Sequence, residues 1–435
     1  MERTRNGRTA ESRYAPNGAG RARQRAFAVG IMLEGDDLSE LKELLRTAGV
    51  ATVGELVQHR DKPHPNLYLG PGKVAEVKAA LERADANLVV TDDELTPRQQ
   101  RNLETELDVP VLDRTAVILD IFADHAHSAE GKLQVELAQL EYNMARMRGL
   151  WTHLERLGAG RGVGGIGTRG PGESQIETDR RLARDRISAL RRRLEEVKGT
   201  RSVMRAERER AHLPTIALAG YTNAGKSTLL NRLTGAEVSV RDRLFHTLDP
   251  TTRTWRLEGR TYLVTDTVGF IRKLPHQLVE AFAATLEETI RADLVLHVVD
   301  ASVPEEELGE MLRAVEDVLE EIGAGDRERL LVLNKADALD DDRRHELAFR
   351  HPEGILVSSL TGEGIEELGE RIVAEFEKHL VDLELLVPFS EGGLLSELHE
   401  LAGDLDREDT PDGVRVAIRL PRPVAARFER YATVS

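Results

Sequence analysis

Eight consecutive residues near the middle of the chain have the types and the spacing that bind phosphate. They read GYTNAGKS over residues 220–227, between an apolar run at 216–219 and a stretch with helical spacing at 228–233. In that context the glycines let the backbone wrap around phosphates, and the amides at the start of the helix point toward negative charge. We predict that Lys226 contacts the β- and γ-phosphates and that the Ser227 hydroxyl holds Mg²⁺. The predicted nucleotide contacts are Gly220, Tyr221, Thr222, Asn223, Ala224, Gly225, Lys226 and Ser227.

Two further stretches complete a site of this kind. A predicted strand at 261–265 is followed by Asp266, Thr267, Val268 and Gly269. The Asp266 carboxylate can reach the Mg²⁺ shell, and the Gly269 amide can contact the γ-phosphate. Residues 245–253 read FHTLDPTTR and form a predicted switch loop, in which one threonine completes the Mg²⁺ shell. Spacing alone leaves three candidates: Thr247, Thr251 and Thr252.

A third pattern, after the apolar run 330–333, indicates which base the site takes. It consists of Asn334, Lys335, Ala336 and Asp337. The Asp337 carboxylate can accept both N–H groups on the Watson–Crick edge of guanine, whereas adenine presents the wrong donor pattern, so we expect specificity for GTP. Asn334 would brace the loop and Lys335 would cover the base. A further loop placed to close over the base holds Ser358, Ser359 and Leu360.

Short apolar runs that alternate with helical patterns predict the strands and helices that position these motifs. Residues 212–380 read as a doubly wound α/β domain with buried strands at 261–265, 294–299 and 330–333. Residues 26–126 predict an N-terminal α/β domain with a largely parallel sheet, with strands at 26–33, 51–58, 87–90 and 109–112 and helices at 38–48, 74–84 and 97–107. Residues 1–25 resemble a basic, disordered tail. Residues 381–435 predict a small C-terminal α/β domain, with strands at 383–387 and 414–419 and helices at 393–402 and 423–431.

Residues 127–211 show a different, heptad-like rhythm. Apolar residues recur at steps of four and three, which predicts two helices packed as an antiparallel hairpin. The seam is Leu133, Leu137, Leu140, Met144, Met147, Trp151 and Leu154 on one helix and Ile187, Leu190, Leu194, Val197 and Met204 on the other. The connection, residues 158–172, is glycine-rich and carries Arg161 and Arg169. Either it probes RNA, because arginine forks suit phosphates, or it is a flexible linker.

The composition limits the class of protein. The 435 residues include no cysteine, which excludes disulfides and thiolate metal sites, and no apolar stretch has the length of a membrane span. The net charge of −16 argues against nonspecific nucleic-acid binding, so any contact with RNA must come from local basic patches. We expect a cytoplasmic and monomeric protein.

Taken together, the motifs resemble those of the HflX family of GTPases. The resemblance rests on GYTNAGKS, on the glycine-rich loop ending at 170–173, and on residues 70–73, 113–115, 118–123, 134–140 and 179–181. Pro71 departs from the family pattern, which places another residue between the two glycines. That departure weakens the case that residues 70–73 bind a second nucleotide. An ATP-dependent RNA remodeller is a further alternative function, and these residues are its only support.

The resemblance implies a GTPase that associates with the large ribosomal subunit and acts in ribosome splitting, rescue or biogenesis. It also implies that the hairpin tip points toward the active-site region of the ribosome, which favours the tip as a probe of RNA. It favours Thr247 as the switch threonine, so that Ser227, Thr247 and Asp266 hold the metal and Lys226, Thr247 and Gly269 act on the transferred phosphoryl group. The remaining predicted contacts of the switch loop are Phe245, His246, Leu248 and Asp249.

The family pattern also raises the question of what activates hydrolysis. Phe270 stands where many GTPases carry a water-orienting glutamine, so activation must come from the ribosome or from a cation. Asn223 stands where related potassium-dependent GTPases bind K⁺; loop bracing is its other role. The alternative to an enzyme is a nucleotide-gated ribosome- or RNA-binding module in which hydrolysis is incidental.

Overall fold

The computed structural model describes residues 24–33, 37–158, 171–210, 213–236, 244–245, 247–273, 275, 283–402 and 405–433. Its contacts divide the chain into two compact units. The first comprises residues 1–194 and 273–281, and the second comprises residues 195–272 and 282–435. Within the described part of the chain, no helix combines the length and apolar composition that crossing a membrane requires.

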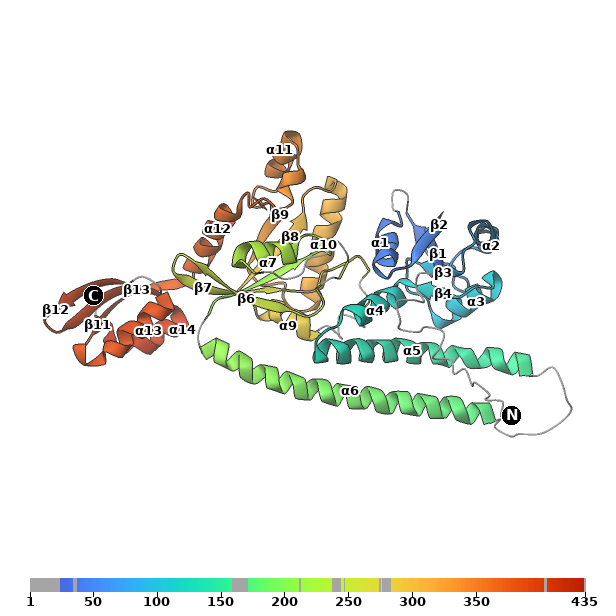
Figure 1. The fold of residues 1–435 in the computed structure, drawn as a ribbon, viewed down its shortest axis with the longest axis horizontal. Coiled ribbons are helices and arrows are strands. Elements are labelled where there is room, and N and C mark those ends of the chain that lie inside the picture. Colours follow the sequence, from blue (N-terminus) through green and yellow to red (C-terminus); the bar gives the residue numbers. More distant parts are fainter. Residues whose placement is uncertain are drawn as a thin grey trace, which may run out of the picture. The chain divides into compact units, whose positions relative to one another are not determined.

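The first unit contains a four-stranded, wholly parallel sheet in the order β2-β1-β3-β4 (Figure 1). Its strands are β1 (Arg25–Met32), β2 (Ala51–His59), β3 (Leu88–Thr91) and β4 (Val111–Asp113), and its helices include α1 (Ser39–Thr47), α2 (Pro71–Ala84) and α3 (Pro97–Leu107). β3 is buried throughout, as expected for a strand covered on both faces. The predicted parallel sheet is therefore confirmed.

One helix of this unit was not predicted. α4 (Arg114–His125) begins immediately after β4, where the Asp113 side chain accepts a hydrogen bond from the amide of Ala116 at 2.9 Å. Because α4 is apolar on most of its faces and largely buried, it lacks the amphipathic rhythm by which helices are recognised in a sequence.

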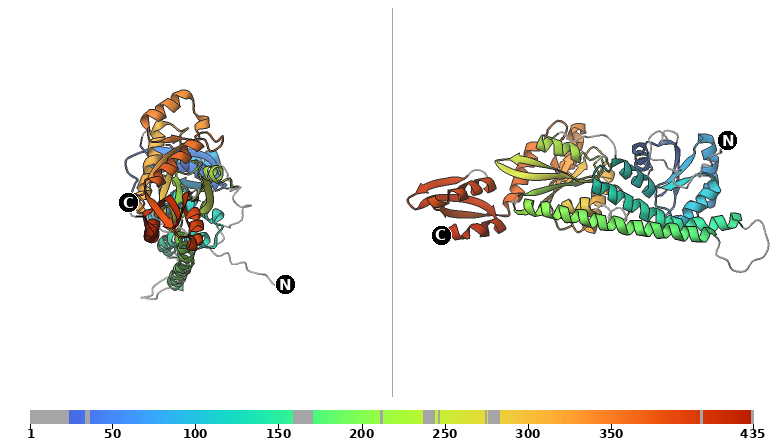
Figure 2. Two further views of the ribbon diagram at one scale, coloured as in Figure 1. Left: turned by 90° about the vertical axis from the view of Figure 1, so that its left-hand side faces the viewer. Right: turned by 60° about the horizontal axis from the view of Figure 1, so that its bottom comes forward.

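The predicted helical hairpin consists of α5 (Ala129–Gly158) and α6 (Pro171–Arg210), which run antiparallel (Figure 2). Leu137 packs against Ile187, Leu190 and Leu194, with Leu133, Leu140 and Met144 at the margin, so the seam is confirmed over this length. Residues 159–170, which include most of the predicted tip, lie outside the described residues, as do the side chains of Met147, Trp151, Leu154 and Met204.

The second unit is built on a six-stranded sheet in the order β10-β9-β8-β5-β7-β6. The strands are β5 (Thr215–Gly220), β6 (Thr251–Leu257), β7 (Arg260–Asp266), β8 (Leu294–Asp300), β9 (Arg329–Asn334) and β10 (Ile355–Leu356). All neighbouring pairs are parallel except β6 and β7. The carboxyl ends of the parallel strands therefore share one edge of the sheet.

Helices cover both faces of this sheet. On one face, α7 (Lys226–Thr234) and α12 (Ile365–Glu377) bury Leu229 and Leu368 against the strands, together with Leu296 of β8. On the other, α10 (Glu305–Glu321) and α11 (Asp341–Arg350) bury Leu308 and Leu347. α9 (Ala283–Arg291) also contacts β5.

The sequence did not predict β6, and its first three residues, Thr251, Thr252 and Arg253, were expected in the switch loop. Thr251 and Thr252 open this edge strand, in which only Trp255 is buried, so the apolar signal of a strand is missing. Their placement in a switch loop is therefore wrong.

The second unit ends in a three-stranded antiparallel sheet of β11 (Leu380–Val387), β13 (Gly413–Pro421) and β12 (Asp406–Thr410), in that order. α13 (Gly392–Ala402) and α14 (Arg422–Phe428) contact it. The predicted strands and helices are present, but β12 was not expected because its acidic, exposed residues DREDT do not alternate with apolar ones.

Candidate nucleotide-binding site

The GYTNAGKS loop connects the carboxyl end of β5 to α7, as predicted. Gly225 precedes the helix at φ +91°, a left-handed conformation, and a Cβ atom there would collide with the Asn334 side-chain amide. The loop thus needs glycine both for its conformation and for a close approach to the end of β9.

Lys226 is the first residue of α7, and its side chain is buried. Its ammonium group donates hydrogen bonds to the carbonyls of Gly220 at 3.0 Å and Tyr221 at 2.9 Å. Burial lowers the pKa of Lys226 to about 8, and the neighbouring Asp266 carboxylate opposes that shift. A buried cation held inside its own loop is suited to an incoming polyanion.

Three oxygen-bearing side chains converge beside Lys226. The Ser227 hydroxyl donates to Asp266 Oδ2 at 2.5 Å and lies 2.9 Å from Thr247 Oγ1. Thr252, by contrast, forms a hydrogen bond with Thr265 between β6 and β7 at 2.9 Å. The fold therefore brings the Thr247 hydroxyl to this cluster, while the Thr252 hydroxyl is engaged elsewhere.

Asp266 is fully buried at the end of β7, and its Oδ1 atom has no hydrogen-bond partner among the described residues. Burial raises the pKa of Asp266, while Lys226, Ser227 and Thr247 oppose the rise. A buried carboxylate oxygen without a partner requires an explanation, and a cation bound next to it would supply the missing contact.

Gly269 carries its backbone directly against the phosphate loop. A Cβ atom at this position would lie 2.8 Å from Thr222 Cγ2 and 3.0 Å from Lys226 Nζ. The Thr222 amide donates to the Phe270 carbonyl at 2.7 Å, and Thr267 Oγ1 donates to the Leu218 carbonyl at 2.7 Å. The predicted γ-phosphate sensor thus touches the loop of residues 220–227.

The base-recognition loops are joined by Asn334, which is buried at the end of β9. Its amide donates to the Ala224 carbonyl at 2.8 Å, and its Oδ1 accepts from the amide of Ser359 at 3.1 Å and from its hydroxyl at 2.9 Å. Asp337 accepts a hydrogen bond from the Ser358 hydroxyl. Asn334 therefore braces three loops at once.

The other residues predicted to contact the nucleotide differ in how deeply they are buried. Phe245 and Leu248 are buried, whereas Asn223 and Leu360 are exposed, Leu360 to 70%. Asn223 has φ +62°, a left-handed conformation that asparagine tolerates. His246 lies outside the described residues.

Residues 70–73 of the first unit are occupied by contacts within that unit. The Gly70 amide donates to Gln58 at 2.8 Å, Lys73 pairs with Glu76 at 2.7 Å, and Pro71 removes one amide donor from the start of α2. This loop therefore offers a poor anion cradle.

Three family models match this chain in succession. Residues 35–123 match the "GTP-binding GTPase N-terminal" family, residues 125–208 the "GTP-binding GTPase Middle Region" and residues 215–335 the "50S ribosome-binding GTPase" family. The chain is 47% identical over 391 residues to GTPase HflX of Lacrimispora saccharolytica, covering 89% of this chain and 90% of that protein. It is 44% identical over 398 residues to GTPase HflX of Escherichia coli, again covering 89% and 90%.

The chain belongs to the HflX family of GTPases. A GTP-binding protein from the archaeon Sulfolobus solfataricus, solved in complex with GDP, is 26% identical with a TM-score of 0.40, covering 80% of this chain and 98% of that one.

In this HflX-family member, three charged residues around the site are not indicated by any motif of the sequence. Arg232 of α7 donates to the Ser359 carbonyl at 3.0 Å, Arg344 of α11 donates to the Ala336 carbonyl at 2.6 Å, and Asp300 at the end of β8 pairs with Lys335 at 2.6 Å. Only Asp300 carried a usable signal, because a carboxylate at the carboxyl end of a buried parallel strand faces the ligand edge. The two arginines belong to helices in which charged residues are ordinary.

Proposed function

We propose that this HflX-family GTPase binds GTP with Mg²⁺ at the loop of residues 220–227 and hydrolyses it in a cycle coupled to the large ribosomal subunit. The observation that carries the nucleotide part is the convergence of Ser227, Thr247 and Asp266 beside the buried Lys226. The donor set fits Mg²⁺, a hard cation that takes oxygen ligands and completes its shell with phosphate and water. The partnerless Asp266 Oδ1 fits it as well.

The proposed roles of the residues follow from their positions. A bound Mg²⁺ would neutralise charge developing on the β- and γ-phosphate oxygens. Lys226 exchanges its backbone carbonyls for phosphate oxygens, and the Gly269 amide donates to the γ-phosphate. Asp337 accepts the two N–H groups of guanine while Ser358 keeps its carboxylate oriented.

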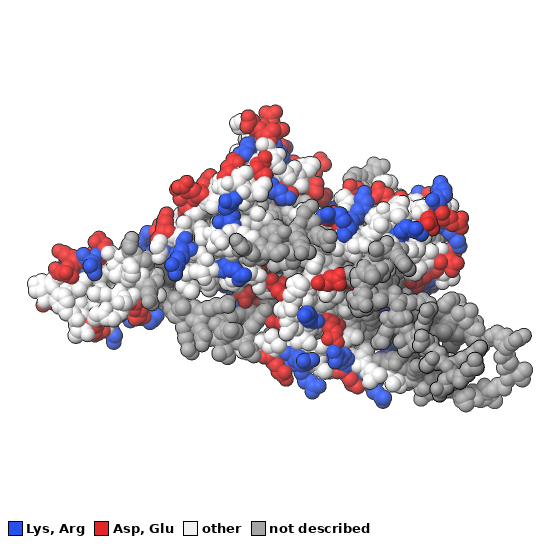
Figure 3. Space-filling model, viewed as in Figure 1, with Lys and Arg blue, Asp and Glu red and all other residues white. Residues whose placement is uncertain are grey.

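Family membership supports the ribosomal part of the proposal. The match to a family described as a 50S ribosome-binding GTPase favours the large subunit as the partner, with ribosome splitting, rescue or biogenesis as the process. We further propose that the hairpin presents its arginine-bearing tip to ribosomal RNA. Acidic and basic side chains are mixed along the described part of α6 (Figure 3), and Arg186 and Arg191 pair with Glu136 and Glu141. The tip sequence, by contrast, carries Arg161 and Arg169 without an acidic residue, which favours the tip as the contact with RNA.

The test measures GTP turnover by the full chain with and without purified large subunits, together with co-sedimentation in GTP and in GDP. We expect turnover to rise at least about tenfold with subunits, since Phe270 is fully buried and supplies no water-orienting group. Asp337→Asn should weaken GTP binding by about 100-fold through loss of the charge-assisted pair, and XTP should replace GTP. The control Asp317→Asn changes an exposed residue of α10.

One alternative has a specific observation in its favour. A nucleotide-gated ribosome-binding module with incidental hydrolysis also accounts for Phe270, whose backbone pairs with the phosphate loop instead of the solvent. Subunits that co-sediment with the chain in GTP but leave turnover unchanged would establish this alternative.

K⁺ at Asn223 is a separate part of the proposal, and it rests on the resemblance to potassium-dependent GTPases, with Asn223 exposed in the loop of residues 220–227. We expect faster turnover in KCl than in NaCl of equal ionic strength. Equal rates would leave Asn223 a loop-bracing residue.

A further inference from the structure

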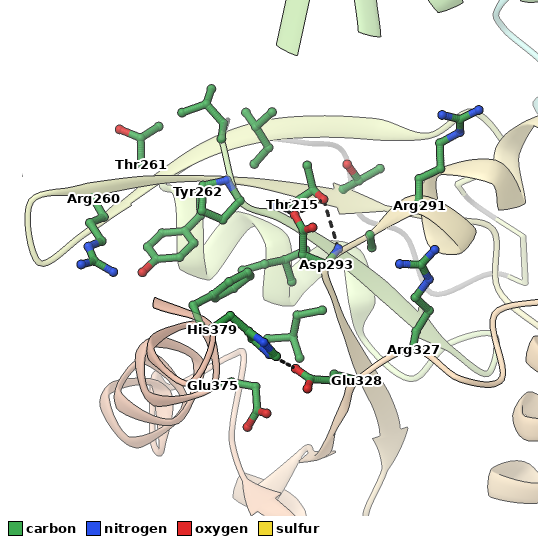
Figure 4. Close-up of a pocket in the computed structure, with 18 of the residues that line it drawn as sticks. Thr215, Arg260, Thr261, Tyr262, Arg291, Asp293, Arg327, Glu328, Glu375 and His379 are labelled. Atoms are coloured by element: carbon green, nitrogen blue, oxygen red, sulfur yellow. Dashed lines mark hydrogen bonds and ion pairs between the residues drawn. The ribbon is translucent and has the colours of Figure 1, made fainter. Parts of the chain in front are cut away.

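A hollow of about 830 Å³ lies at the edge of the second sheet opposite the nucleotide motifs, where β5, β7 and β8 begin (Figure 4). Thr215, Tyr262 and Leu294 line it from the strands, and Phe376, Leu420 and Val424 close it from α12 and the C-terminal part of the unit. Its volume falls within the range of small-molecule sites. Its lining mixes apolar side chains with charged ones, namely five carboxylates and four arginines.

The acidic groups of this hollow are mostly engaged by neighbours. Asp293 accepts hydrogen bonds from the amide and the hydroxyl of Thr215, both at 2.8 Å. Glu328 meets His379 at 3.0 Å, and Glu375 pairs with Lys378 at 2.7 Å. These contacts satisfy three of the five carboxylates that line the hollow, so those three do not call for a cationic ligand.

The basic groups differ in this respect. Arg291 pairs with Glu287 at 3.0 Å and Arg419 with Glu377 at 3.2 Å. Arg260 and Arg327 form no ion pair with any residue in the described ranges. Arg327 is exposed next to the equally exposed Asp326, whereas Arg260 is half-buried at the start of β7. Arg260 is therefore the cation that an anion in the hollow would meet.

Tyr262 provides a second polar group on the same side of β7. Its ring is fully buried between Trp255 and Phe376, with centroid distances of 5.7 and 5.4 Å. Its hydroxyl has no hydrogen-bond partner of good geometry among the described residues. Burial raises the pKa of Tyr262, and Arg260 opposes that rise through its charge and through the approach of its side chain to the hydroxyl. An arginine can only donate, so the hydroxyl still lacks an acceptor for its own proton. Figure 4 shows both side chains pointing the same way from the strand.

We propose that this hollow binds a small organic anion, whose charged end pairs with Arg260 and the Tyr262 hydroxyl and whose apolar body packs against Phe376, Leu420 and Val424. A buried hydroxyl without a partner is unfavourable, and an acceptor on the ligand removes that penalty. The adjacent guanidinium makes the acceptor an anion, since charge-assisted hydrogen bonds are the stronger ones.

This second site is distinct from the nucleotide site and does not rest on the function proposed above. Tyr262 and Asp266 lie four residues apart on β7, which corresponds to roughly 13 Å along a strand. We therefore expect the anion and the guanine nucleotide to bind together.

The test uses the full chain and two fluorescent dyes with nearly the same apolar body: 8-anilinonaphthalene-1-sulfonate, which is an anion, and N-phenyl-1-naphthylamine, which is neutral. The sulfonate should bind saturably and about tenfold more tightly than the neutral dye. Arg260→Gln should remove that difference, whereas Arg313→Gln, at an exposed arginine of α10, should leave it unchanged. Excess GDP with Mg²⁺ should not displace the sulfonate.

Equal binding of the two dyes by the unsubstituted chain, unchanged sulfonate binding in the Arg260→Gln chain, or displacement by GDP would each overturn the proposal. Tyr262→Phe separates binding from folding. It should weaken sulfonate binding about threefold or more while the unfolding midpoint without dye stays the same or rises, because the hydroxyl has no partner to lose. A lowered midpoint would show instead that the hydroxyl is structural and would remove Tyr262 from the site.

Discussion

Lys226 makes a quantitative prediction about protons. Burial lowers the pKa of this lysine to about 8 in the nucleotide-free chain, whereas its ordinary value is 10.5. Phosphate oxygens next to the ammonium group favour the charged form, so nucleotide binding should restore the pKa toward the ordinary value. Above pH 8 the free chain has lost this proton and the complex has kept it, so binding must take a proton from solution and must weaken as the pH rises.

The size of the effect follows from the two pKa values. At pH 8.5 the free lysine is about one quarter protonated and the bound lysine almost fully, so each GDP should take up about 0.75 proton. At pH 7.0 the uptake should fall to about 0.1 proton. GDP affinity should drop about fourfold between these two pH values, which corresponds to about 0.8 kcal/mol.

Isothermal titration calorimetry in buffers of different ionisation enthalpy measures the uptake directly. The matched control is Lys226→Arg, because a guanidinium keeps its charge at both pH values. Any proton exchange by the guanine base is the same in both chains and cancels in their difference. The difference between the two chains should approach the predicted uptake at pH 8.5 and vanish at pH 7.0. No excess uptake at pH 8.5 in the unsubstituted chain would refute the argument that Lys226 is a desolvated cation awaiting phosphate.

Two further predictions concern the loops and the core. Asn334→Ala removes three hydrogen bonds to Ala224 and Ser359, worth about 1 kcal/mol each. Fluorescent-nucleotide titration should therefore show GDP binding about 10- to 100-fold more weakly. The control Asn143→Ala, at an exposed site on α5, should bind GDP normally. Unchanged affinity would show that the loops hold their shape without Asn334. The second prediction concerns His297, whose pKa is lowered to about 4 by burial in β8. Between pH 7 and 5 this histidine takes up a proton in the unfolded chain but not in the folded one. Acidification over that range should therefore lower the free energy of unfolding by about 2 kcal/mol. His297→Leu should remove that loss in urea titrations and the exposed His399→Leu should not; equal pH dependence in both variants would contradict the assignment.

Elements with a clear apolar rhythm could be predicted from the sequence alone. The strands β1, β8 and β9 and the seam of the hairpin are examples, because burial on one or both faces leaves a periodic signal in the residues themselves. Elements without that signal were missed. The edge strand β6 buries only Trp255, β12 is acidic and exposed, and α4 is apolar on most sides.

The site shows the same division. Local chemistry predicted GYTNAGKS as a phosphate loop and Asp337 as the candidate for reading guanine, because each motif needs only its own residues and the strand before it. Contacts between distant segments could not be read in this way. The contact between Thr247 and Ser227 became visible only in the fold. The same holds for the contacts of Arg232 and Arg344 with Ser359 and Ala336, and for the partnerless Asp266 Oδ1.

The physical reason is that spacing along the chain reports what one element can do, whereas distances between side chains depend on how elements pack. Residue types alone determined that this chain carries a guanine-nucleotide site and a helical hairpin. Tertiary structure decided which threonine meets Ser227 and how deeply Lys226 is desolvated. It also placed Arg260 and Tyr262 at a hollow on the opposite edge of the same sheet.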